Sequence, residues 1–453
     1  STADVGTWDD DPEHATGKNP KTGIWREGAN EWGNLTLMGN GLISASHFDG
    51  QPVGDNTKYP TGMNEKQMEG LTADFPGDTK VLYGGMDDND DSGSIRYLSI
   101  RYAGRVIGLG NELNGLSLGA IGRDTDISHV EIMNNVDDGI EIWGGAVCLD
   151  HISIWNVGDD SLDVDQGWRG KAQFGLIVQG YSVDADQGSG VGDNCIETDG
   201  AEDSDAQPVT TTSIYNFTVV GQPIDGDGGT TWRDNARVQY RNCIFMDLGD
   251  QLVRFDGDDG DGANGYGYNE TLSWEETWTT DAGTHSTVNA ATDPAPGAFN
   301  HPDTLYQVQK DGKLAEIKDS VFFRNLKNNA YTEADLRGVR DAENNNVTAA
   351  SDAMPIQRID RDAPAMRGGL TMLRVTDINP RASRDAVVSV AYAPADGFFT
   401  PAPYRGGFSP YYNWLEGWTA ADAYGMTDIS GNVEIGEGSG MAGDTNGDGI
   451  VNA

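Results

Sequence analysis

The chain has 453 residues, and its 72 acidic side chains outnumber its 30 basic ones, so the formal net charge is −42. Such a surface repels phosphate backbones and anionic lipid headgroups, which excludes nucleic acid as a partner and favours cations. Hydrophobic residues make up 37% of the chain and 61 residues are glycine, which together predict a folded protein with many tight turns and short strands.

The N-terminal part is expected to be an extension or cap over residues 1–30. No apolar run in the sequence approaches the roughly 18 residues that cross a bilayer, so membrane insertion is not expected. The first residue is Ser1, not Met, and we interpret the sequence as a mature chain that has lost an export signal. We therefore expect a bacterial protein that is secreted, either extracellular or at the cell surface.

A repeat of 22 residues dominates the next region. The segment DISHVEIMNNVDDGIEIWGG (126–145) aligns without gaps with CLDHISIWNVGDDSLDVDQG (148–167), and His129 falls on His151. Apolar residues alternate with polar ones in both segments, which is the two-residue period of a strand. A leucine-rich repeat would show leucines at fixed spacing and often a helical return, whereas here the return limb is another strand. The repeat therefore predicts an all-β, right-handed parallel β-helix, a solenoid of stacked coils.

The predicted β-helix covers residues 31–425. Further rungs are predicted at 94–104, 111–122, 193–200, 212–221, 243–257 and 313–326. A loop insertion is expected at about 257–305, where Gly, Asp, Thr and Pro interrupt the strand pattern, and a Gly-rich linker is expected at 426–442. The three cysteines, Cys148, Cys195 and Cys243, form no CxxC spacing, and we interpret each as a buried thiol.

The sequence ends in the first nine positions of a calcium loop, within 443–453. Asp444, Asn446, Asp448 and Asn452 supply side-chain oxygens at positions 1, 3, 5 and 9, and Ile450 supplies its backbone carbonyl at position 7. Gly449 supplies the sharp turn at position 6. The bidentate acid of position 12 would follow Ala453, and we expect the natural chain to continue. The alternative is a glycine turn rich in Asn and Asp that binds no metal.

Acidic turns within the β-helix are a second candidate calcium site. Stacking of the two aligned repeats, about 4.8 Å apart, places their aspartates next to one another. The residues concerned are Asp137, Asp138, Asp159, Asp160, Asp163 and Asp165. Like charges this close need a cation, a proton or a hydrogen-bonded turn. The sequence leaves two alternatives for these carboxylates, calcium binding and local turn hydrogen bonds. The same two alternatives apply to the acidic segments 87–91 and 256–261.

Paired carboxylates are equally the machinery of glycoside hydrolysis. The segment GDDSLDVD (158–165) resembles the paired aspartates of polygalacturonases, but the Gly-His-Gly and Arg-x-Lys segments of that family are absent. Lyases of β-helix fold combine calcium with a nearby base, which Arg169 or Lys171 could supply. His129 and His151 are expected to stack as a packing pair. No catalytic residue is assigned.

Four segments together resemble a family of secreted bacterial β-helix proteins: WGNLTLMGNGLI (32–43), YGGMDDNDDSGSIRYLSIRYAG (83–104), GDDSLDVDQGWRGKAQFGLIVQG (158–180) and FFTPAPYRGGFSPYYNWLEGWTAADAYG (398–425). The resemblance implies the fold and the location, and it carries no catalytic residue. The closing GDTNGDGIVNA resembles the first half of a dockerin-type calcium loop, whose family binds calcium and often a partner domain.

The sequence therefore predicts a non-catalytic, calcium-binding structural or adhesive protein of the cell surface, a surface layer, a fibre or a matrix. Its expected partners are calcium, copies of itself or other surface proteins, and polysaccharide. The alternative is a calcium-dependent polysaccharide lyase or glycoside hydrolase, in which the 11 Trp and 16 Tyr could stack on sugar rings.

Overall fold

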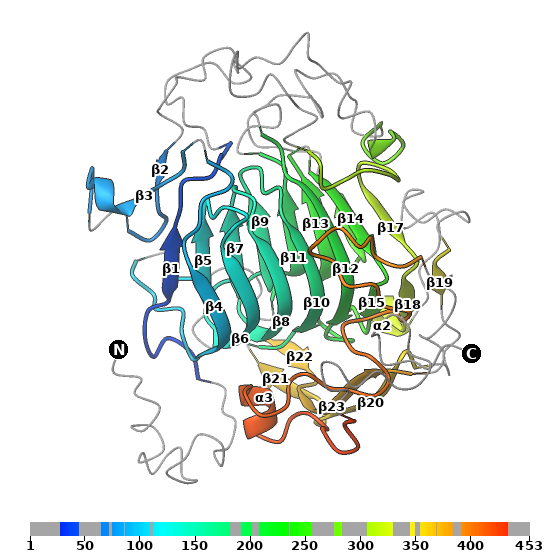
Figure 1. Ribbon diagram of the computed structural model, residues 1–453. Coiled ribbons are helices and arrows are strands. Elements are labelled where there is room, and N and C mark those ends of the chain that lie inside the picture. The colour runs from blue at the N-terminus through cyan, green and yellow to red at the C-terminus, as the bar shows by residue number, and fades with distance from the viewer. Residues whose placement is uncertain are drawn as a thin grey trace.

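In the described parts of the computed structural model, the regular secondary structure is almost entirely β-strand (Figure 1). The structure describes residues 28–44, 65–71, 75–85, 87–108, 112–181, 192–201, 208–234, 236–255, 276–282, 306–328, 345–348, 354–367, 369–383 and 391–433. Within these residues, no helix is both long and apolar enough to cross a membrane.

One wall of the molecule is a seven-stranded parallel sheet. Its strands lie side by side in the order β1 (Leu35–Met38), β5 (Leu116–Gly119), β7 (Ile140–Trp143), β9 (Leu162–Asp165), β11 (Asn194–Asp199), β13 (Gly228–Arg233) and β16 (Val253–Phe255). Each strand hydrogen-bonds to the equivalent strand one coil further along the chain, so sequence order is also spatial order.

The opposite wall is a ten-stranded parallel sheet with longer strands. It contains β4 (Ser94–Arg101), β6 (Asp126–Asn135), β8 (Cys148–Val157), β10 (Lys171–Val178), β12 (Thr211–Val220), β14 (Arg237–Arg241), β15 (Ile244–Met246), β17 (Glu316–Lys318), β18 (Val321–Phe323) and β19 (Val347–Thr348). The chain alternates between the two sheets, and this alternation makes a parallel β-helix (Figure 1). The prediction of a right-handed parallel β-helix is confirmed.

The register confirms the 22-residue repeat. Ile127 pairs with Leu149 in the ten-stranded sheet, and Ile140 pairs with Leu162 in the seven-stranded sheet, each at the predicted shift. Inward side chains of both sheets, such as Ile154, are fully buried between the walls. Each such burial stabilises the fold by roughly 1.5–3 kcal/mol. The other predicted rungs also contain strands, from β4 to β18.

A column of stacked rings marks the place where the long strands bend. Tyr97, His129, His151 and Phe174 occupy equivalent positions on β4, β6, β8 and β10, and all have positive φ, between 55° and 59°. This conformation is unfavourable for side chains with a Cβ atom. Ring stacking offsets the cost, because successive centroids lie 4.4, 4.4 and 4.9 Å apart.

The predicted His129–His151 stack is therefore confirmed as packing. The rings are nearly parallel, with an interplanar angle of 9°. Burial, together with the neighbouring charge of His151, lowers the pKa of His129 to about 4. His129 is thus neutral at neutral pH.

The chain beyond β19 packs outside the coils. It forms two antiparallel pairs, of β20 (Ile356–Arg361) with β23 (Val375–Ala382) and of β21 (Ala365–Arg367) with β22 (Leu370–Met372). Residues 391–433, which include α3 (Ala420–Ala423), then cross the bend of the ten-stranded sheet. There the Asn216 side chain donates to the carbonyl of Tyr404, at 2.8 Å, and Trp414 lies edge-on to His151.

The smaller elements sit at the ends of the coils. They are β2 (Lys66–Gln67), a 3₁₀ turn at Thr79–Val81, β3 (Leu82–Tyr83) and α2 (Asn325–Asn328).

The cysteines are all free: Cys195 and Cys243 are buried as predicted. The prediction is wrong for Cys148, which is only partly buried because it begins β8 with its side chain on the outer face.

A buried ion pair ties the N-terminal coils together. The guanidinium of Arg169 is fully buried, bonds both carboxylate oxygens of Asp88 and donates to the carbonyl of Leu42. Burial alone would raise the pKa of Asp88, but Arg169 outweighs it and holds this pKa below its ordinary value. Arg169 is therefore a structural residue and cannot serve as the base suggested by the sequence.

Replacing Asp88 with Ala is expected to destabilise the protein by about 3–5 kcal/mol, because the buried Arg169 charge loses its partner. The shift in the urea midpoint would measure the effect. Asp91→Ala is the matched control, since that exposed carboxylate only accepts the N–H of Gly93. Equal shifts for both variants would contradict the structural role of the pair.

Candidate metal-binding face

Acidic turn residues stack from coil to coil beside the seven-stranded sheet, as the sequence predicted. One oxygen of Asp138 accepts the N–H of Asp160 at 2.8 Å, and one oxygen of Asp160 accepts the N–H of Asn194 at 2.5 Å. Both carboxylates are buried. These bonds join neighbouring coils and are not the local turn hydrogen bonds of the alternative interpretation, so calcium binding by these residues stays a prediction.

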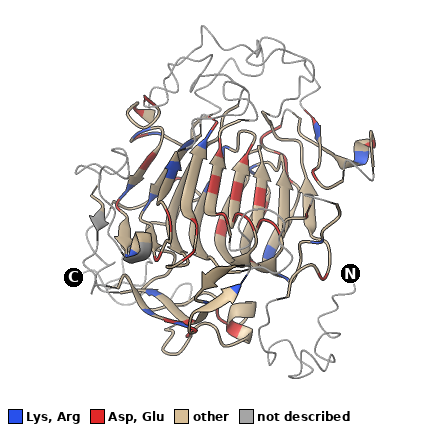
Figure 2. Ribbon diagram, turned by 180° about the vertical axis from the view of Figure 1, so that it is seen from behind, with Lys and Arg blue, Asp and Glu red and all other residues tan. Residues whose placement is uncertain are grey.

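A second acidic row runs across the outer surface of this sheet. Glu141 on β7 pairs directly with Asp163 on β9, and Ile196 pairs with Leu162, which places Glu197 on β11 beside Asp163. Figure 2 shows acidic positions in red on neighbouring strands in the middle of the sheet. Adjacent members are one strand spacing apart, about 4.8 Å.

A third acidic column precedes the strands, one aspartate per coil. Its members are Asp137, Asp159, Asp193, Asp227 and Asp250. The N–H of Asp193 donates to the carbonyl of Asp159 at 3.1 Å, which fixes these two coils in register. We call the three rows together, with Asp165 and Asp199 at the strand ends, the acidic face.

Two groups of carboxylates on the acidic face are close enough to share one ion. Oxygens of Asp137, Asp138 and Asp159 lie within 4.8 Å of one another, and so do oxygens of Asp138, Glu141 and Asp163. Asp138 belongs to both groups, so the two potential sites are adjacent. All the donors are carboxylate oxygens, the ligand type that calcium and other hard cations prefer.

Burial and mutual repulsion disfavour ionisation of the carboxyl groups on the acidic face. Burial and the charge of Asp193 raise the pKa of Asp159 to about 7, and burial and Asp193 do the same for Asp227. Burial and neighbouring carboxylates also raise the pKa of a further set, Asp137, Asp138, Glu141, Asp160 and Asp163. A bound cation would remove this repulsion.

Partners within the face neutralise only part of it. Arg233 bonds Asp199 at 2.5 Å and lies 3.3 Å from Glu197, and the amide of Asn114 donates to Glu141. The Oδ1 atom of Asp163 is buried and has no hydrogen-bond partner. An unpartnered buried carboxylate oxygen between two further carboxylates fits a metal ligand.

The structure places the other predicted site residues elsewhere. Asp165 accepts the N–H of Gln166 at 2.5 Å, at the edge of the acidic face. The loop with Asp444, Asn446, Asp448, Ile450 and Asn452 lies outside the described residues, as does 256–261. In 87–91, Asp87 and Asp91 accept local N–H groups as the turn interpretation predicts, whereas Asp88 bonds Arg169. Lys171 lies on the opposite sheet.

Sequence reasoning missed half of the acidic face. Glu141, Glu197 and Asp199 were not predicted as ligands, and of the third column only Asp137 and Asp159 were predicted, without Asp193, Asp227 and Asp250. The similarity of DDGIEIWG (137–144) to DNCIETDG (193–200) already aligns Glu141 with Glu197. The recurrence of an aspartate just before each strand, from Asp137 to Asp250, would have revealed the third column.

Comparison with known proteins identifies the family of the chain. A family model described as a pectate-lyase-like beta helix domain matches residues 26–313. The chain belongs to this family. The pectate-lyase-like domain includes every strand that carries the acidic face. Neither the comparison with curated proteins nor the one with solved structures gives a match.

The raised pKa values predict an unusual pH dependence of the metal-free pectate-lyase-like domain. Asp159 and Asp227 bind protons more tightly in the folded state than in the unfolded state, where their pKa is about 4. Their contribution to stability is present below pH 4 and is lost as the pH rises to about 7. In EDTA, Asp159→Asn with Asp227→Asn is expected to reduce the loss of melting temperature between pH 5 and pH 7.5.

The control for this measurement is Asp91→Asn, which lies outside the acidic face. The same slope of melting temperature against pH in wild type and in the double variant would contradict the assignment.

Proposed function

We propose that the protein binds calcium on the acidic face and, through it, an acidic polysaccharide outside the bacterial cell. The observation that carries the proposal is the row Glu141, Asp163 and Glu197, in register on adjacent strands, with a buried and unpartnered oxygen on Asp163. Calcium bound there would supply the positive charge that attracts carboxylates of a ligand.

Calcium fits better than a transition metal. The two groups of potential ligands contain carboxylates alone, without an imidazole or a thiolate among the described residues that form them. Calcium accepts many oxygen ligands in flexible geometry, which suits side chains spaced by strand stacking. Asp138 is shared by both groups, which favours two neighbouring ions over one.

An acidic polysaccharide fits the shape and charge of the surface. The acidic face extends along the helix axis over several coils, so a linear ligand can follow it (Figure 2). Without cations, the net charge of −42 repels a polyanion. Membership of the pectate-lyase-like family supports a carbohydrate ligand.

Catalysis is the second candidate, and the raised pKa values of Asp163 and Glu141 favour it. Burial and neighbouring carboxylates favour the protonated forms, which suits a general acid beside a carboxylate base. Glu141 and Glu197 are two strands apart, about 9.6 Å by strand spacing, near the upper end of the roughly 6.5–9.5 Å of inverting glycosidases. Hydrolysis suits these residues better than elimination, because Asp199 outweighs burial and raises the pKa of Arg233, which makes Arg233 a poor base.

Calcium affinity is the first test. In chelator-treated protein, Glu141→Gln with Asp163→Asn is expected to weaken calcium binding at least about tenfold, since two charged ligands are lost. Isothermal titration calorimetry would measure it, and melting with calcium against EDTA would give a parallel readout. Asp444→Asn with Asp448→Asn separates the C-terminal loop from the acidic face. Unchanged affinity and an unchanged melting temperature in the first variant would overturn the calcium assignment.

Polysaccharide binding and cleavage form the second test. Affinity electrophoresis with acidic and neutral polysaccharides, in calcium and in EDTA, is expected to show stronger retention by acidic ones in calcium than in EDTA. Reducing ends would reveal hydrolysis and unsaturated ends elimination, and either at enzymatic rates would exclude the non-catalytic structural or adhesive role. Loss of cleavage in Glu141→Gln with binding retained would place catalysis on the acidic face. No retention of any acidic polysaccharide would contradict the proposed ligand.

A further inference from the structure

A groove crosses the outer face of the other sheet, far from the acidic face. Two adjoining cavities, of about 230 Å³ and 270 Å³, share Val308, Lys310 and Asp396 in their walls. Their floor is formed by outward side chains at the starts of β10, β12 and β14, such as Lys171, and by those of β17. We call this feature the basic groove.

Hydrogen bonds and an ion pair hold both walls of the basic groove in place. On one side, the Gln239 side chain donates to the carbonyls of Asp311 and Lys313, at 2.7 and 2.8 Å. On the other side, Asn242 donates to the carbonyl of Ala391, at 2.9 Å, and Lys171 pairs with Asp396, at 2.5 Å. The groove is therefore formed before any ligand binds, as is usual for binding sites.

The charge of the groove is opposite to that of the protein. One cavity is lined by Arg123, Arg169, Lys171 and Lys310, with Asp396 as its one acidic side chain among the described residues. Asp88 pairs with Arg169 and lies 3.9 Å from Arg123, and Asp396 pairs with Lys171. The other cavity adds Arg241 and Lys318 together with Asp311 and Asp319, so six cations and three carboxylates line the groove as a whole. Distant acidic groups are screened beyond about 8 Å at physiological ionic strength, so the local cations decide what binds.

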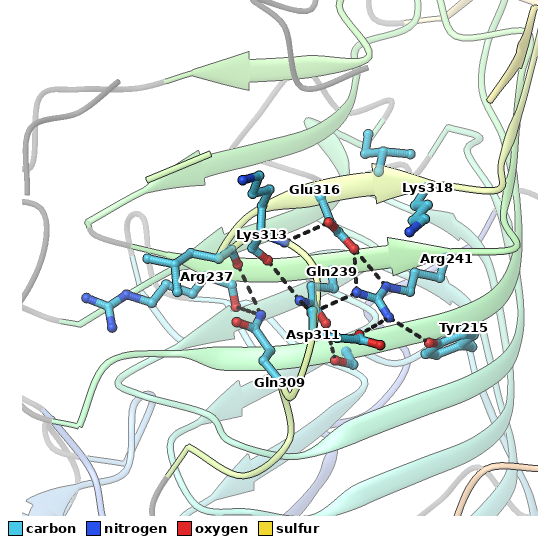
Figure 3. Close-up of polar contacts among 12 residues, drawn as sticks. Tyr215, Arg237, Gln239, Arg241, Gln309, Asp311, Lys313, Glu316 and Lys318 are labelled. Atoms are coloured by element: carbon cyan, nitrogen blue, oxygen red, sulfur yellow. Dashed lines mark hydrogen bonds and ion pairs between the residues drawn. The ribbon is translucent and has the colours of Figure 1, made fainter. Parts of the chain in front are cut away.

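Two lysines in the groove have ammonium groups without a hydrogen bond or ion pair among the described residues. Arg241 is fully engaged, because it bonds Glu316, Asp311 and the hydroxyl of Tyr215 (Figure 3). Lys310 and Lys318 line the cavity, and neither ammonium group forms a hydrogen bond or an ion pair within the described part of the chain. Both lysines can therefore accept an anionic ligand without breaking an existing contact.

We propose that the basic groove binds a short acidic saccharide, with its carboxylates on Lys310 and Lys318 and one sugar ring on Tyr392. The ring of Tyr392 is 49% exposed and lines the same cavity. This inference rests on the acidic polysaccharide of the proposed function, but it needs no calcium. The acidic face would bind this type of ligand through calcium, and the basic groove would bind it directly through its lysines.

A saccharide fits the groove better than an isolated phosphate or sulfate. The cations are spread along the helix axis over several strands, from Arg123 at one end to Lys318 at the other. Between them Ser213 and Gln239 line the floor and are hydrogen-bonded to each other. A linear ligand with repeated carboxylates and hydroxyls matches this spacing, whereas a single small anion would contact one cation or two.

The test uses tetragalacturonate and the full chain in EDTA, measured by calorimetry. Wild type is expected to bind, and Lys310→Ala with Lys318→Ala to bind about tenfold more weakly, because two charge-assisted contacts are lost. Lys80→Ala with Arg105→Ala removes two exposed charges elsewhere and is expected to leave the affinity unchanged. Melting temperatures equal to that of wild type would show that the variants fold.

Two further arms identify the ligand and separate this inference from the proposed function. Tyr392→Ala is expected to weaken tetragalacturonate binding, and inorganic sulfate is expected to compete poorly. Glu141→Gln with Asp163→Asn is expected to keep binding in EDTA. No binding by wild type in EDTA would overturn the basic groove while leaving calcium-dependent binding intact. Equal binding by the lysine variant would overturn it too, and strong competition by sulfate with no effect of Tyr392→Ala would overturn the saccharide assignment.

Discussion

Parallel hydrogen bonding between successive coils is the constraint on which everything else depends. It stacks residues one repeat apart at the spacing of strands, about 4.8 Å, whatever their chemistry. Where the stacked residues are apolar, as with Ile140 and Leu162, the result is the core. Where they are rings, as with His129 and His151, it is a column that tolerates positive φ. Where they are carboxylates, it is a concentration of charge that the protein alone does not neutralise.

The acidic face is thus a place where stability and function oppose each other. Glu141 and Asp163 are held side by side although burial raises the pKa of both, with a further rise from Asp163 on Glu141 and from Glu197 on Asp163. A sequence selected for stability alone would place Thr or Asn on such a row, as the same row does at Thr231 on β13. The concentration of carboxylates on β7, β9 and β11 therefore indicates a ligand, and a hard cation is the simplest ligand that relieves the repulsion.

The two outer surfaces of the β-helix have opposite electrostatic character. The seven-stranded sheet carries carboxylates and one engaged cation, Arg233, in its acidic face. The ten-stranded sheet is covered at its bend by 391–433, and beside this cover it leaves a groove with Lys310 and Lys318 exposed to a ligand. Buried pairs such as Arg169 with Asp88 are neutral overall and hold the coils together, so their charges belong to the fold.

The sequence by itself determined the β-helix, the 22-residue register and the stacking of the aspartates at 137–138 and 159–160, because a strand repeat without gaps fixes which residues meet. It also indicated the stacked histidines for the same reason. Only the tertiary structure decided which carboxylate oxygens accept backbone N–H groups. It also decided that Arg169 is buried against Asp88 and that Asp163 keeps an unpartnered oxygen. The basic groove lay beyond the sequence altogether, since its walls come from 307–311 and 391–399. These segments carry no repeat, so tertiary contacts alone bring them to β12 and β14.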